Sequence, residues 1–402
     1  MGWDRIRGDG PGTRAGNRSS AGQRSSAWRA GPGWCMMTPS AVNPDAPAFL
    51  FATCNPGWET ALKAEMRSRH GELLAPAFLR PGLVTWKAKG ALPADSRAPL
   101  PVFAHVSGFS LGMAKTSADL PALLGGLESP PDRLHVFPRV LPENGFTAAE
   151  WEAIDLRRAE IESVLRDAGH DLDPSPPRKG DLVLDVILGD EGEALFAGWH
   201  HHTRHHRHFA GGMPRAILPN DAPSRAWLKM EQGLHCAELG APDSLVGKTA
   251  LELGSAPGGG SLSLLSHGAK VIGVDTGDMD ARVLGYENAS GAAFTHFAIS
   301  AGEVRVEDLP PRVDLLASDM NLAPPVALRY IERLQRRVRA RTLLLTLKIN
   351  DAKMQAQIPA FLDRVRKFAP GEPVATQLPA NRKEITILAR DAPRPNPHRS
   401  RR

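Results

Sequence analysis

The chain has 402 residues, of which 42% are hydrophobic and 23% charged, a balance typical of globular proteins with two or three domains. No apolar run approaches the length that crosses a bilayer, which excludes a transmembrane protein. The formal net charge is +5, but six arginines in residues 1–40 and four in residues 391–402 carry it. Because the body between these ends is slightly acidic, overall basicity does not by itself indicate a nucleic-acid partner.

The three cysteines, Cys35, Cys54 and Cys236, form no CxxC pair. Neither a disulfide framework nor a thiolate metal site is indicated, and a reducing cytoplasm is the expected location. Both ends of the chain are rich in arginine and lack helical or strand periodicity. We expect residues 1–46 to be a disordered Arg/Gly/Ser-rich tail and residues 392–402 to be a basic tail.

Residues 47–211 show the patterns of a mixed α/β region. Apolar residues recur at helical spacing in WETALKAEMRSRHG, and Thr147 with Glu150 forms the pattern of a capping box before a longer helix. The predicted strands are APAFLFAT, GLVTWKA, PVFAHVSGFSLG and the hairpin DLVLDVILGDEGEALFAGW. No constellation of acids or nucleophiles is apparent here, so binding or support is the expected role.

Residues 212–391 follow a seam rich in Gly and Pro, and they alternate strictly between helix and strand patterns. The predicted strands are TALELG, KVIGVD, AFTHFAI, VDLLASD, TLLLTLK and EITILAR. The predicted helices are SRAWLKMEQGLHCAEL, capped by Ser224, a helix from Pro257, DARVLGYENAS, residues 324–340 and a last one before EITILAR. This alternation predicts a doubly wound, mostly parallel α/β sheet of the Rossmann type, with ligands beyond the carboxyl ends of its strands.

A glycine-rich turn, GSAPGGG, follows the first of these strands. Two phosphate-binding interpretations of the turn fail. The GKT at residues 247–249 precedes the strand, and the first glycine of a P-loop is missing. The dinucleotide pattern GxGxxG has Ala256 at its second glycine, followed by Pro257, and these side chains crowd out a pyrophosphate.

S-adenosylmethionine carries no phosphate and tolerates the bulkier turn. Gly254 permits the tight bend, and Pro257 is expected to preset the first helical turn. Asp275, at the end of the next strand, can accept hydrogen bonds from ribose hydroxyls. The alternative is a structural strand-to-helix turn with a surface aspartate.

The turn, together with VIGVDTGDM, SDM at 318–320 and LTLK at 345–348, resembles the FtsJ-type ribose 2'-O-methyltransferases. The resemblance implies an S-adenosylmethionine donor held by Ser224, Gly254, Ser255, Ala256, Pro257, Gly258, Gly259 and Asp275. It also implies a catalytic Lys-Asp-Lys-Glu tetrad, which matches Lys229, Asp319, Lys348 and Glu384 in order.

This tetrad suits methyl transfer to a ribose hydroxyl, which is a weak acid. A base must remove its proton, or a cation must stabilise the developing alkoxide. A buried lysine beside a second cation can act as a base near neutral pH. Lys348 is the candidate base and Lys229 the neighbouring cation, while Asp319 and Glu384 orient the two amines. Taken singly, each of these four residues is more often an ordinary surface charge.

One branch of the family, the RlmM-type enzymes that methylate a cytidine ribose of 23S ribosomal RNA, is similar over more of the chain. The similarity lies in LFATCNPGWETALKAEM and in residues 211–232. It implies a THUMP-like RNA-binding region at 47–211, an FtsJ-like methyltransferase domain at 212–391 and ribosomal RNA, 23S or its precursor, as the partner. The oligomeric state is not indicated.

Two departures from the family keep alternatives open. Gly260 stands where the family usually has Trp, and HFAISAGEV lacks the acid expected near the third strand, with Glu303 the nearest. A non-catalytic RNA-binding or ribosome-assembly protein with a vestigial donor site is therefore one alternative. A methyltransferase acting on another structured RNA, or on a base, is the other.

Two basic runs lie outside these motifs. WHHHTRHHRHFAGGMPR holds six His and three Arg between residues 199 and 215. Because it contains neither acids nor cysteines, we expect no metal there; RNA contact and an exposed linker are about equally favoured. RYIERLQRRVRAR, at residues 329–341, holds six Arg. A solvated helix face is favoured over a phosphate grip.

Overall fold

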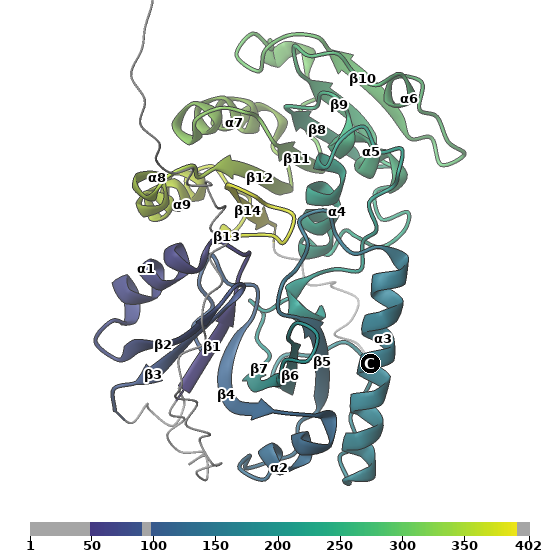
Figure 1. Cartoon of the computed structure of the whole chain (residues 1–402). Coiled ribbons are helices and arrows are strands. Elements are labelled where there is room, and N and C mark those ends of the chain that lie inside the picture. The colour runs from purple at the N-terminus through teal and green to yellow at the C-terminus, as the bar shows by residue number, and fades with distance from the viewer. Residues whose placement is uncertain (1–48, 91–97, 392–402) are drawn as a thin grey trace, which may run out of the picture. The chain divides into compact units, whose positions relative to one another are not determined.

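The computed structural model describes residues 49–90 and 98–391 (Figure 1). These residues fall within one compact unit, Ala41–Arg402, and form two sheets of seven strands each. The predicted tails, residues 1–46 and 392–402, lie outside the described residues. The predicted seam near residue 212 falls between the last strand of the first sheet and the first strand of the second.

The first sheet is mainly antiparallel and has the order β2-β3-β1-β4-β7-β6-β5, with β5 and β6 parallel. Its strands are β1 Phe49–Thr53, β2 Leu74–Arg80, β3 Leu83–Ala88, β4 Ser107–Ala114, β5 Arg133–Pro138, β6 Leu182–Leu188 and β7 Leu195–His201. Its helices are α1 Glu59–His70, α2 Leu120–Leu124 and α3 Ala148–Asp167. Apolar residues of α2 and α3, including Leu120 and Ile161, pack with strand residues such as Leu134 and Val186 in one buried cluster.

Three predictions for residues 47–211 are confirmed: the end of the first helix, the capping box and the hairpin. Helix α1 ends at His70, before Gly71, as its spacing predicts. At α3 the capping box forms: the Thr147 N–H donates to the Glu150 carboxylate at 2.7 Å, and the Glu150 N–H donates to Thr147 Oγ1 at 3.3 Å. The predicted hairpin is the antiparallel pair β6 and β7.

The strand predicted from PVFAHVSGFSLG is partly wrong, because only the portion from Ser107 onward is a strand. Residues 102–106 are buried, yet their backbone groups bond outside a ladder. The Thr53 N–H donates to Val106 O, and the Gln377 N–H donates to Val102 O. The apolar run at residues 102–106 therefore indicates burial and does not indicate a strand. The sequence patterns did not predict β2, β5 and α2.

The second sheet confirms the Rossmann-type prediction. Its order is β10-β9-β8-β11-β12-β14-β13, parallel except for β14, which runs antiparallel to both neighbours. The strands are β8 Thr249–Leu253, β9 Lys270–Val274, β10 Ala293–Phe297, β11 Leu315–Ser318, β12 Thr342–Lys348, β13 Val374–Thr376 and β14 Glu384–Arg390. The helices are α4 Ala226–Cys236, α5 Gly259–Ser266, α6 Ala281–Leu284, α7 Pro324–Val338, α8 Ala352–Ala356 and α9 Ile358–Arg366.

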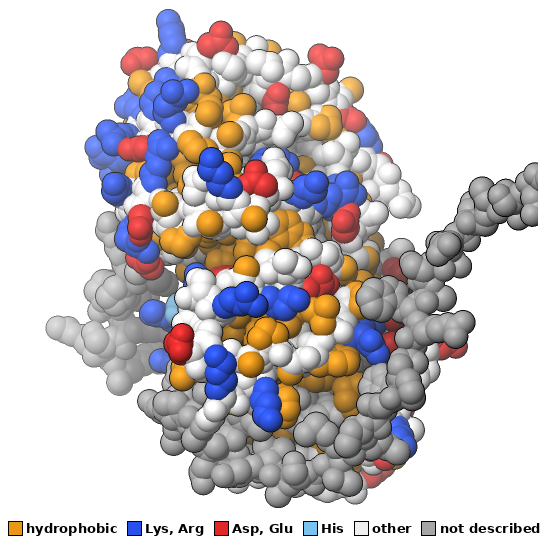
Figure 2. Space-filling view, turned by 60° about the vertical axis from the view of Figure 1, so that its left-hand side comes forward, with side chains coloured by type: hydrophobic (Ala, Val, Ile, Leu, Met, Phe, Trp, Pro, Cys, Tyr) orange, Lys and Arg blue, Asp and Glu red, His pale blue; other side chains and the backbone are white. Residues whose placement is uncertain are grey.

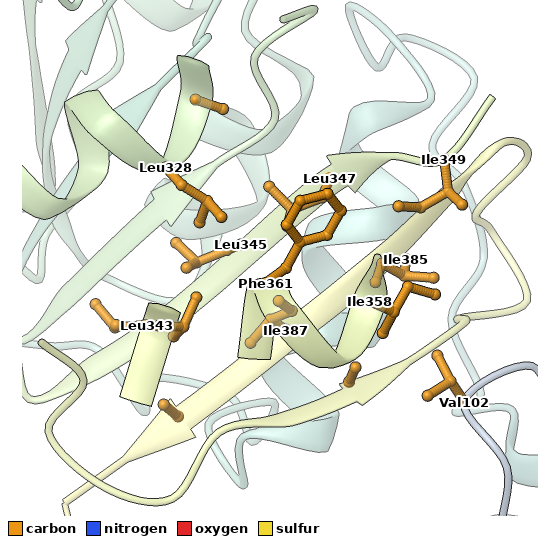
Figure 3. Packing of buried hydrophobic residues seen from close by; sticks show 14 of the residues in the cluster. Val102, Leu328, Leu343, Leu345, Leu347, Ile349, Ile358, Phe361, Ile385 and Ile387 are labelled. Atoms are coloured by element: carbon orange, nitrogen blue, oxygen red, sulfur yellow. The ribbon is translucent and has the colours of Figure 1, made fainter. Parts of the chain in front are cut away.

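Both faces of this sheet are covered by helices, as its sequence pattern requires. On β12, Leu343, Leu345 and Leu347 pack with α7 and α9, where Leu328 and Phe361 lie close by (Figure 3). The intervening Leu344 joins the opposite cluster, formed with α4 and α5. Because both faces are buried, the strand is a continuous apolar run. No helix among the described residues is long and apolar enough to cross a membrane.

Three predicted helix features differ from the structure. Helix α4 begins after Arg225, so Ser224 is one residue too early to be the formal cap, although its Oγ accepts from the Ala226 N–H at 3.3 Å. Helix α5 begins at Gly259 after a left-handed Gly258 (φ 115°), so Pro257 does not lie in its first turn. The segment DARVLGYENAS is helical only over the single turn of α6, which Gly285 ends. Strand β13 was also missed.

Candidate active site

The four predicted tetrad residues come from four elements that meet at one edge of the second sheet. Lys229 lies on α4, Asp319 follows the last residue of β11, Lys348 ends β12 and Glu384 begins β14. Because β14 is antiparallel to β12, its first residue lies opposite the last residue of β12, and Lys348 and Glu384 are direct register partners. The topology thus brings together residues that lie up to 155 positions apart in the chain.

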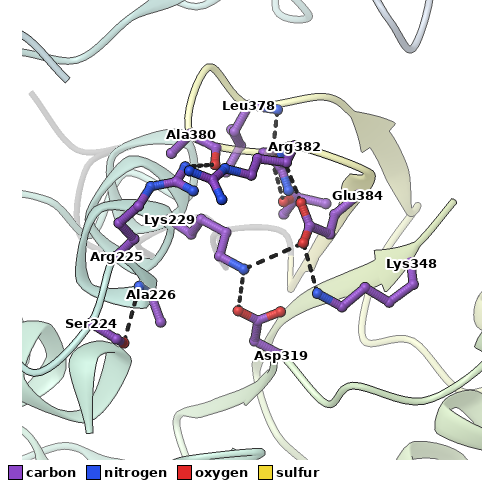
Figure 4. Close-up of polar contacts among 12 residues, drawn as sticks. Ser224, Arg225, Ala226, Lys229, Asp319, Lys348, Leu378, Ala380, Arg382 and Glu384 are labelled. Carbon is purple, nitrogen blue, oxygen red and sulfur yellow. Dashed lines mark hydrogen bonds and ion pairs between the residues drawn. The ribbon is translucent and has the colours of Figure 1, made fainter. Parts of the chain in front are cut away.

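The structure joins all four side chains in one polar cluster (Figure 4). Lys348 Nζ lies 2.7 Å from Glu384 Oε1, and the same oxygen lies 3.8 Å from Lys229 Nζ. Lys229 also forms an ion pair with Asp319. The side chains are between 9% and 22% exposed. The cluster is thus partly buried, and Lys229 and Asp319 also line a small pocket.

Glu384 is the hub of the cluster. Its second carboxylate oxygen, Oε2, accepts a hydrogen bond from the Arg382 N–H at 2.6 Å, which fixes the plane of the carboxylate. Burial raises the pKa of Glu384, but the charge of Lys229 and the hydrogen bond from Lys348 outweigh burial and hold the pKa below its ordinary value. The carboxylate therefore stays ionised and holds the amines of both lysines.

Asp319 lies against the glycine turn. Its N–H donates to Leu253 O at 3.0 Å, which joins the end of β11 to the end of β8. Gly254 has φ 82°, and a Cβ added there would lie 2.9 Å from backbone atoms of Asp319. Only glycine allows this close approach. Asp319 Oδ1 is buried and has no hydrogen-bond partner among the described residues, so it can accept a hydrogen bond from a ligand.

Asp275 is fixed by the glycine turn. Its Oδ2 accepts from the Ala256 N–H at 3.1 Å and its Oδ1 accepts from the Gly277 N–H at 2.8 Å. A carboxylate has about four lone-pair sites, so these two bonds leave acceptor capacity for hydroxyl groups. The turn and the aspartate thus form one unit at the carboxyl ends of β8 and β9.

The remaining predicted donor residues surround this unit. A Cβ added at Gly259 would lie 2.3 Å from Ser224 Oγ, so the start of α5 packs directly on the segment before α4. A Cβ added at Gly258 would lie 2.7 Å from Val283. Ser255 is buried, and the peptide between Ala256 and Pro257 is cis. The structure therefore brings the predicted donor residues and the tetrad to neighbouring ends of the same strands.

Two arginines next to the tetrad were missed from the sequence. Arg225 precedes Lys229 by one helical turn, and its guanidinium donates to the carbonyls of Glu143 and Ala380 at 2.9 and 3.0 Å. The Arg382 side chain pairs with Glu143 and is 56% exposed. The i, i+4 spacing of Arg225 and Lys229 is a signal that could have revealed the first of them.

A buried acid lies beneath the site and was also missed. Glu252, in β8, is 2% exposed, and it lines a small pocket together with Lys229, Asp319 and Gly260. The Ser261 hydroxyl donates to its Oε2 at 2.5 Å. Burial raises the pKa of Glu252 to about 8. A Cβ at Gly260 would lie 2.2 Å from Glu252 Oε1, so the glycine that replaces the family's Trp leaves room for this carboxyl group.

The two basic runs are only partly available to a partner. In the histidine run, His201, Arg204 and His205 are exposed, whereas His200 and His202 are buried, so an exposed linker is wrong for those two. RNA contact by the exposed ones stays a prediction.

In α7, two arginines bind the chain's own carbonyls. Arg333 donates to Ala301 O and Val304 O, and Arg337 donates to Val306 O. On the face shown in Figure 2, basic side chains lie among acidic and hydrophobic ones. The solvated helix face therefore remains the favoured interpretation of this arginine run.

The sheet order, the glycine turn with its aspartate and the clustered tetrad define a Rossmann-type methyltransferase domain. Residues 222–354 match the model of the FtsJ-like methyltransferase family. The match covers α4, the glycine turn, Asp275 and the first three tetrad residues, and it ends before Glu384.

Curated relatives agree with the family. The chain is 31% identical to the ribosomal RNA large subunit methyltransferase M of Halorhodospira halophila, over 44% of this chain and 50% of that protein. It is 31% identical to the protein of the same name from Pseudomonas aeruginosa, over 54% of this chain and 60% of that protein. The matches thus span between about half and three fifths of these relatives' length.

Among solved structures, TrmN from Thermus thermophilus is 18% identical, covering 85% of this chain and 99% of that one with a TM-score of 0.31. Similarity at this level carries no further argument.

Proposed function

We propose that the protein transfers a methyl group from S-adenosylmethionine to a ribose 2'-hydroxyl of RNA. The observation that carries the proposal is the cluster of Lys229, Asp319, Lys348 and Glu384 beside the glycine turn. Two lysine amines share one carboxylate oxygen there in a partly buried site, an arrangement that isolated surface charges do not need. Two lysines held close together provide both a base and a cation for the developing alkoxide.

Each residue has a distinct role in the proposed reaction. Lys348 accepts the proton of the ribose hydroxyl, and Lys229 stabilises the negative charge that develops on the oxygen. Glu384 positions both amines, because its Oε1 faces Lys348 at 2.7 Å and Lys229 at 3.8 Å. Asp319 holds Lys229 from the opposite side. When bound, the donor supplies an electrophilic methyl group on a sulfonium centre.

The residues around the turn fit the donor. Asp275 keeps acceptor sites for ribose hydroxyls while two backbone N–H groups fix its carboxylate. Asp319 Oδ1 is a buried acceptor without a partner in the part of the chain that the structure describes, and a ligand group that donates a hydrogen bond would satisfy it. The missing acid after β10 leaves the adenine amine without an evident carboxylate partner, and Glu303 is engaged by Ser300. The described residues therefore offer hydrogen-bond partners to the ribose and the amino-acid portions of the donor, and fewer to its adenine.

The proposed substrate is ribosomal RNA of the large subunit, with a cytidine of 23S RNA as the expected target. The names of the curated relatives support the class of RNA. The first sheet and its helices would form the THUMP-like RNA-binding region at 47–211, and residues 212–391 would form the catalytic domain. Arg225 and Arg382 border the tetrad, and phosphate groups entering the site would meet these two guanidinium groups.

The direct test is transfer of labelled methyl from S-adenosylmethionine to unmodified large-subunit ribosomal RNA, followed by digestion to nucleosides. Label on a ribose 2'-oxygen is the expected result, and cytidine is the expected nucleoside. Label on a base would contradict the proposed nucleophile. Label only on another RNA would leave the chemistry standing and overturn the substrate. Folded protein that binds no S-adenosylmethionine would favour the RNA-binding alternative with a vestigial donor site.

A further inference from the structure

A group of histidines converges at the end of β7, outside the methyltransferase domain. His200 lies in β7, His202 follows the strand and His206 lies in the next turn. One ligand nitrogen from each lies within 4.8 Å of the others. His200 and His202 are only 3% and 7% exposed. The ring centroids of His200 and His206 are 4.6 Å apart, and those of His202 and His206 are 5.7 Å apart.

Each of the three rings has a buried nitrogen that finds no hydrogen-bond partner within residues 49–90 and 98–391. These atoms are His200 Nε2, His202 Nδ1 and His206 Nε2. Native proteins rarely leave buried polar atoms unpaired, and such a group calls for a bound water or ion. Three unpaired imidazole nitrogens in one place match the preference of late transition metals for nitrogen ligands.

A carboxylate from the neighbouring strand completes the pattern. Asp185, on β6, is fully buried, and its Oδ2 lies 2.5 Å from His200 Nδ1. Its other oxygen lies 3.6 Å from His135 Nδ1. A carboxylate that accepts the N–H of a ligating imidazole fixes the tautomer and makes the other nitrogen a better ligand. This contact is not apparent from the sequence, because Asp185 lies 15 residues before His200. The pairing of β6 with β7 brings the two side chains together.

We propose that His200, His202 and His206 bind a divalent transition-metal ion, with zinc as the first choice, and that Asp185 orients His200. Ligands made only of imidazole exclude magnesium and calcium, which take oxygen ligands. Nitrogens at 2.0–2.1 Å from one tetrahedral zinc ion lie about 3.3 Å apart, so the rings would close inward by about an ångström. A water molecule would be the fourth ligand of the zinc ion. The ion would join the end of β7 to the turn at 203–206.

The contacts of Thr203 bear on the tautomer of His206. Nδ1 of His206 faces the N–H and the Oγ1 of Thr203 at 3.0 and 2.9 Å. The Thr203 N–H donates to this nitrogen, so ligation through Nε2 requires Nδ1 to give up that bond and to donate its own proton to Thr203 Oγ1.

The test measures zinc binding to the full-length chain, purified without a histidine tag and stripped with a chelator. Competition with a chromophoric chelator gives the stoichiometry and the affinity. The visible absorption of the cobalt-substituted protein tests whether the ion is four-coordinate with three nitrogen ligands. We expect one ion per chain. His206→Asn should lower the affinity at least about a hundredfold, because losing a ligand costs more than losing a carboxylate that only orients a ligand. His205→Asn is the matched control, since His205 is exposed and adjacent.

Two outcomes overturn the proposal. One is a wild-type protein, folded by circular dichroism, that binds no zinc or cobalt. The other is an equal loss of affinity in His205→Asn and His206→Asn, which would show non-specific binding to exposed histidines. Asp185→Asn should weaken binding about tenfold to a hundredfold with all three ligands present. If that variant does not fold, the comparison of the two histidine variants decides. No readout depends on methyl transfer.

Discussion

Lys348 and Glu384 face each other across the β12–β14 ladder, and Lys348 Nζ lies 2.7 Å from Glu384 Oε1. The same carboxylate oxygen lies 3.8 Å from Lys229 Nζ. One acid at the start of the one antiparallel strand of this sheet therefore holds both lysines of the proposed tetrad.

Neutralising that acid should separate the two amines. In Glu384→Gln the side chain keeps its shape but loses the charge that attracts Lys229 and Lys348. We expect methyl transfer to fall about 10²- to 10⁴-fold, the range for a misplaced general base, while affinity for S-adenosylmethionine stays within about twofold. Single-turnover transfer and calorimetry measure the two quantities. Glu372→Gln, at an exposed acid paired with Arg366, is the control; an unchanged rate in Glu384→Gln would remove Glu384 from the mechanism.

Loss of the Asp275 carboxylate should weaken donor binding. Asp275→Ala removes the proposed acceptor of the ribose hydroxyls and the two bonds that order the turn. Charge-assisted hydrogen bonds contribute about 1.5–3 kcal/mol, which corresponds to an affinity for S-adenosylmethionine lower by about tenfold to a hundredfold. Calorimetric titration measures this affinity, with Asp278→Ala, at an exposed neighbour, as control. Equal affinity in both variants would show that the donor does not use Asp275.

Gly254 should tolerate no side chain. In Gly254→Ala a Cβ must lie 2.9 Å from the backbone of Asp319 at φ 82°. Gly247→Ala is a matched control, because its φ is 72° but its Cβ meets nothing within 4 Å. We expect Gly254→Ala to lower the free energy of unfolding by about 1–3 kcal/mol more than Gly247→Ala, and to lower donor affinity as well. Denaturant titration makes the comparison, and equal losses would mean that strain in φ accounts for both.

The buried Glu252 should make stability depend on pH. Its pKa is raised from an ordinary value of 4.5 to about 8, so between these values the folded state holds a proton that the unfolded chain has lost. This group therefore lowers stability as pH rises, with a slope of up to about 1.4 kcal/mol per pH unit. Glu252→Gln removes the effect, and we expect its stability relative to wild type to increase from pH 5 to pH 8.

Denaturant titrations at several pH values measure this difference for Glu252→Gln. Glu152→Gln, at an exposed glutamate of α3, is the control. A constant difference between Glu252→Gln and wild type across this range would show that Glu252 is ionised in the folded protein.

The sequence predicted those parts of the fold and site that local pattern and strand ends determine. The continuous apolar run of β12 predicts a strand that is buried on both faces. In the structure its residues pack against the helices on both faces of the Rossmann-type sheet. The four residues of the proposed tetrad were predicted because a motif assigns them one by one, and Lys348 and Glu384 are register partners at the same edge of the sheet. The structure then brings Lys229 and Glu384, 155 residues apart, to 3.8 Å.

Features that depend on tertiary contacts were missed. Glu252 appears as an ordinary residue of an apolar strand, and its role as a buried acid depends on the space that Gly260 leaves. The run that contains His200 lacks an acid in sequence, whereas Asp185 reaches it across a strand pair. Buried residues 102–106 resemble a strand because burial and strand pairing leave the same apolar signal.

The most direct measurement is single-turnover methyl transfer to unmodified large-subunit ribosomal RNA by wild type, Lys348→Ala and Lys383→Ala. Lys383 is exposed and adjacent to Glu384, so it controls for loss of a positive charge at the same place. Label on a ribose 2'-oxygen with wild type and Lys383→Ala, together with loss of transfer in Lys348→Ala at unchanged donor affinity, is the predicted result. Transfer by Lys348→Ala at the wild-type rate would contradict the proposed mechanism.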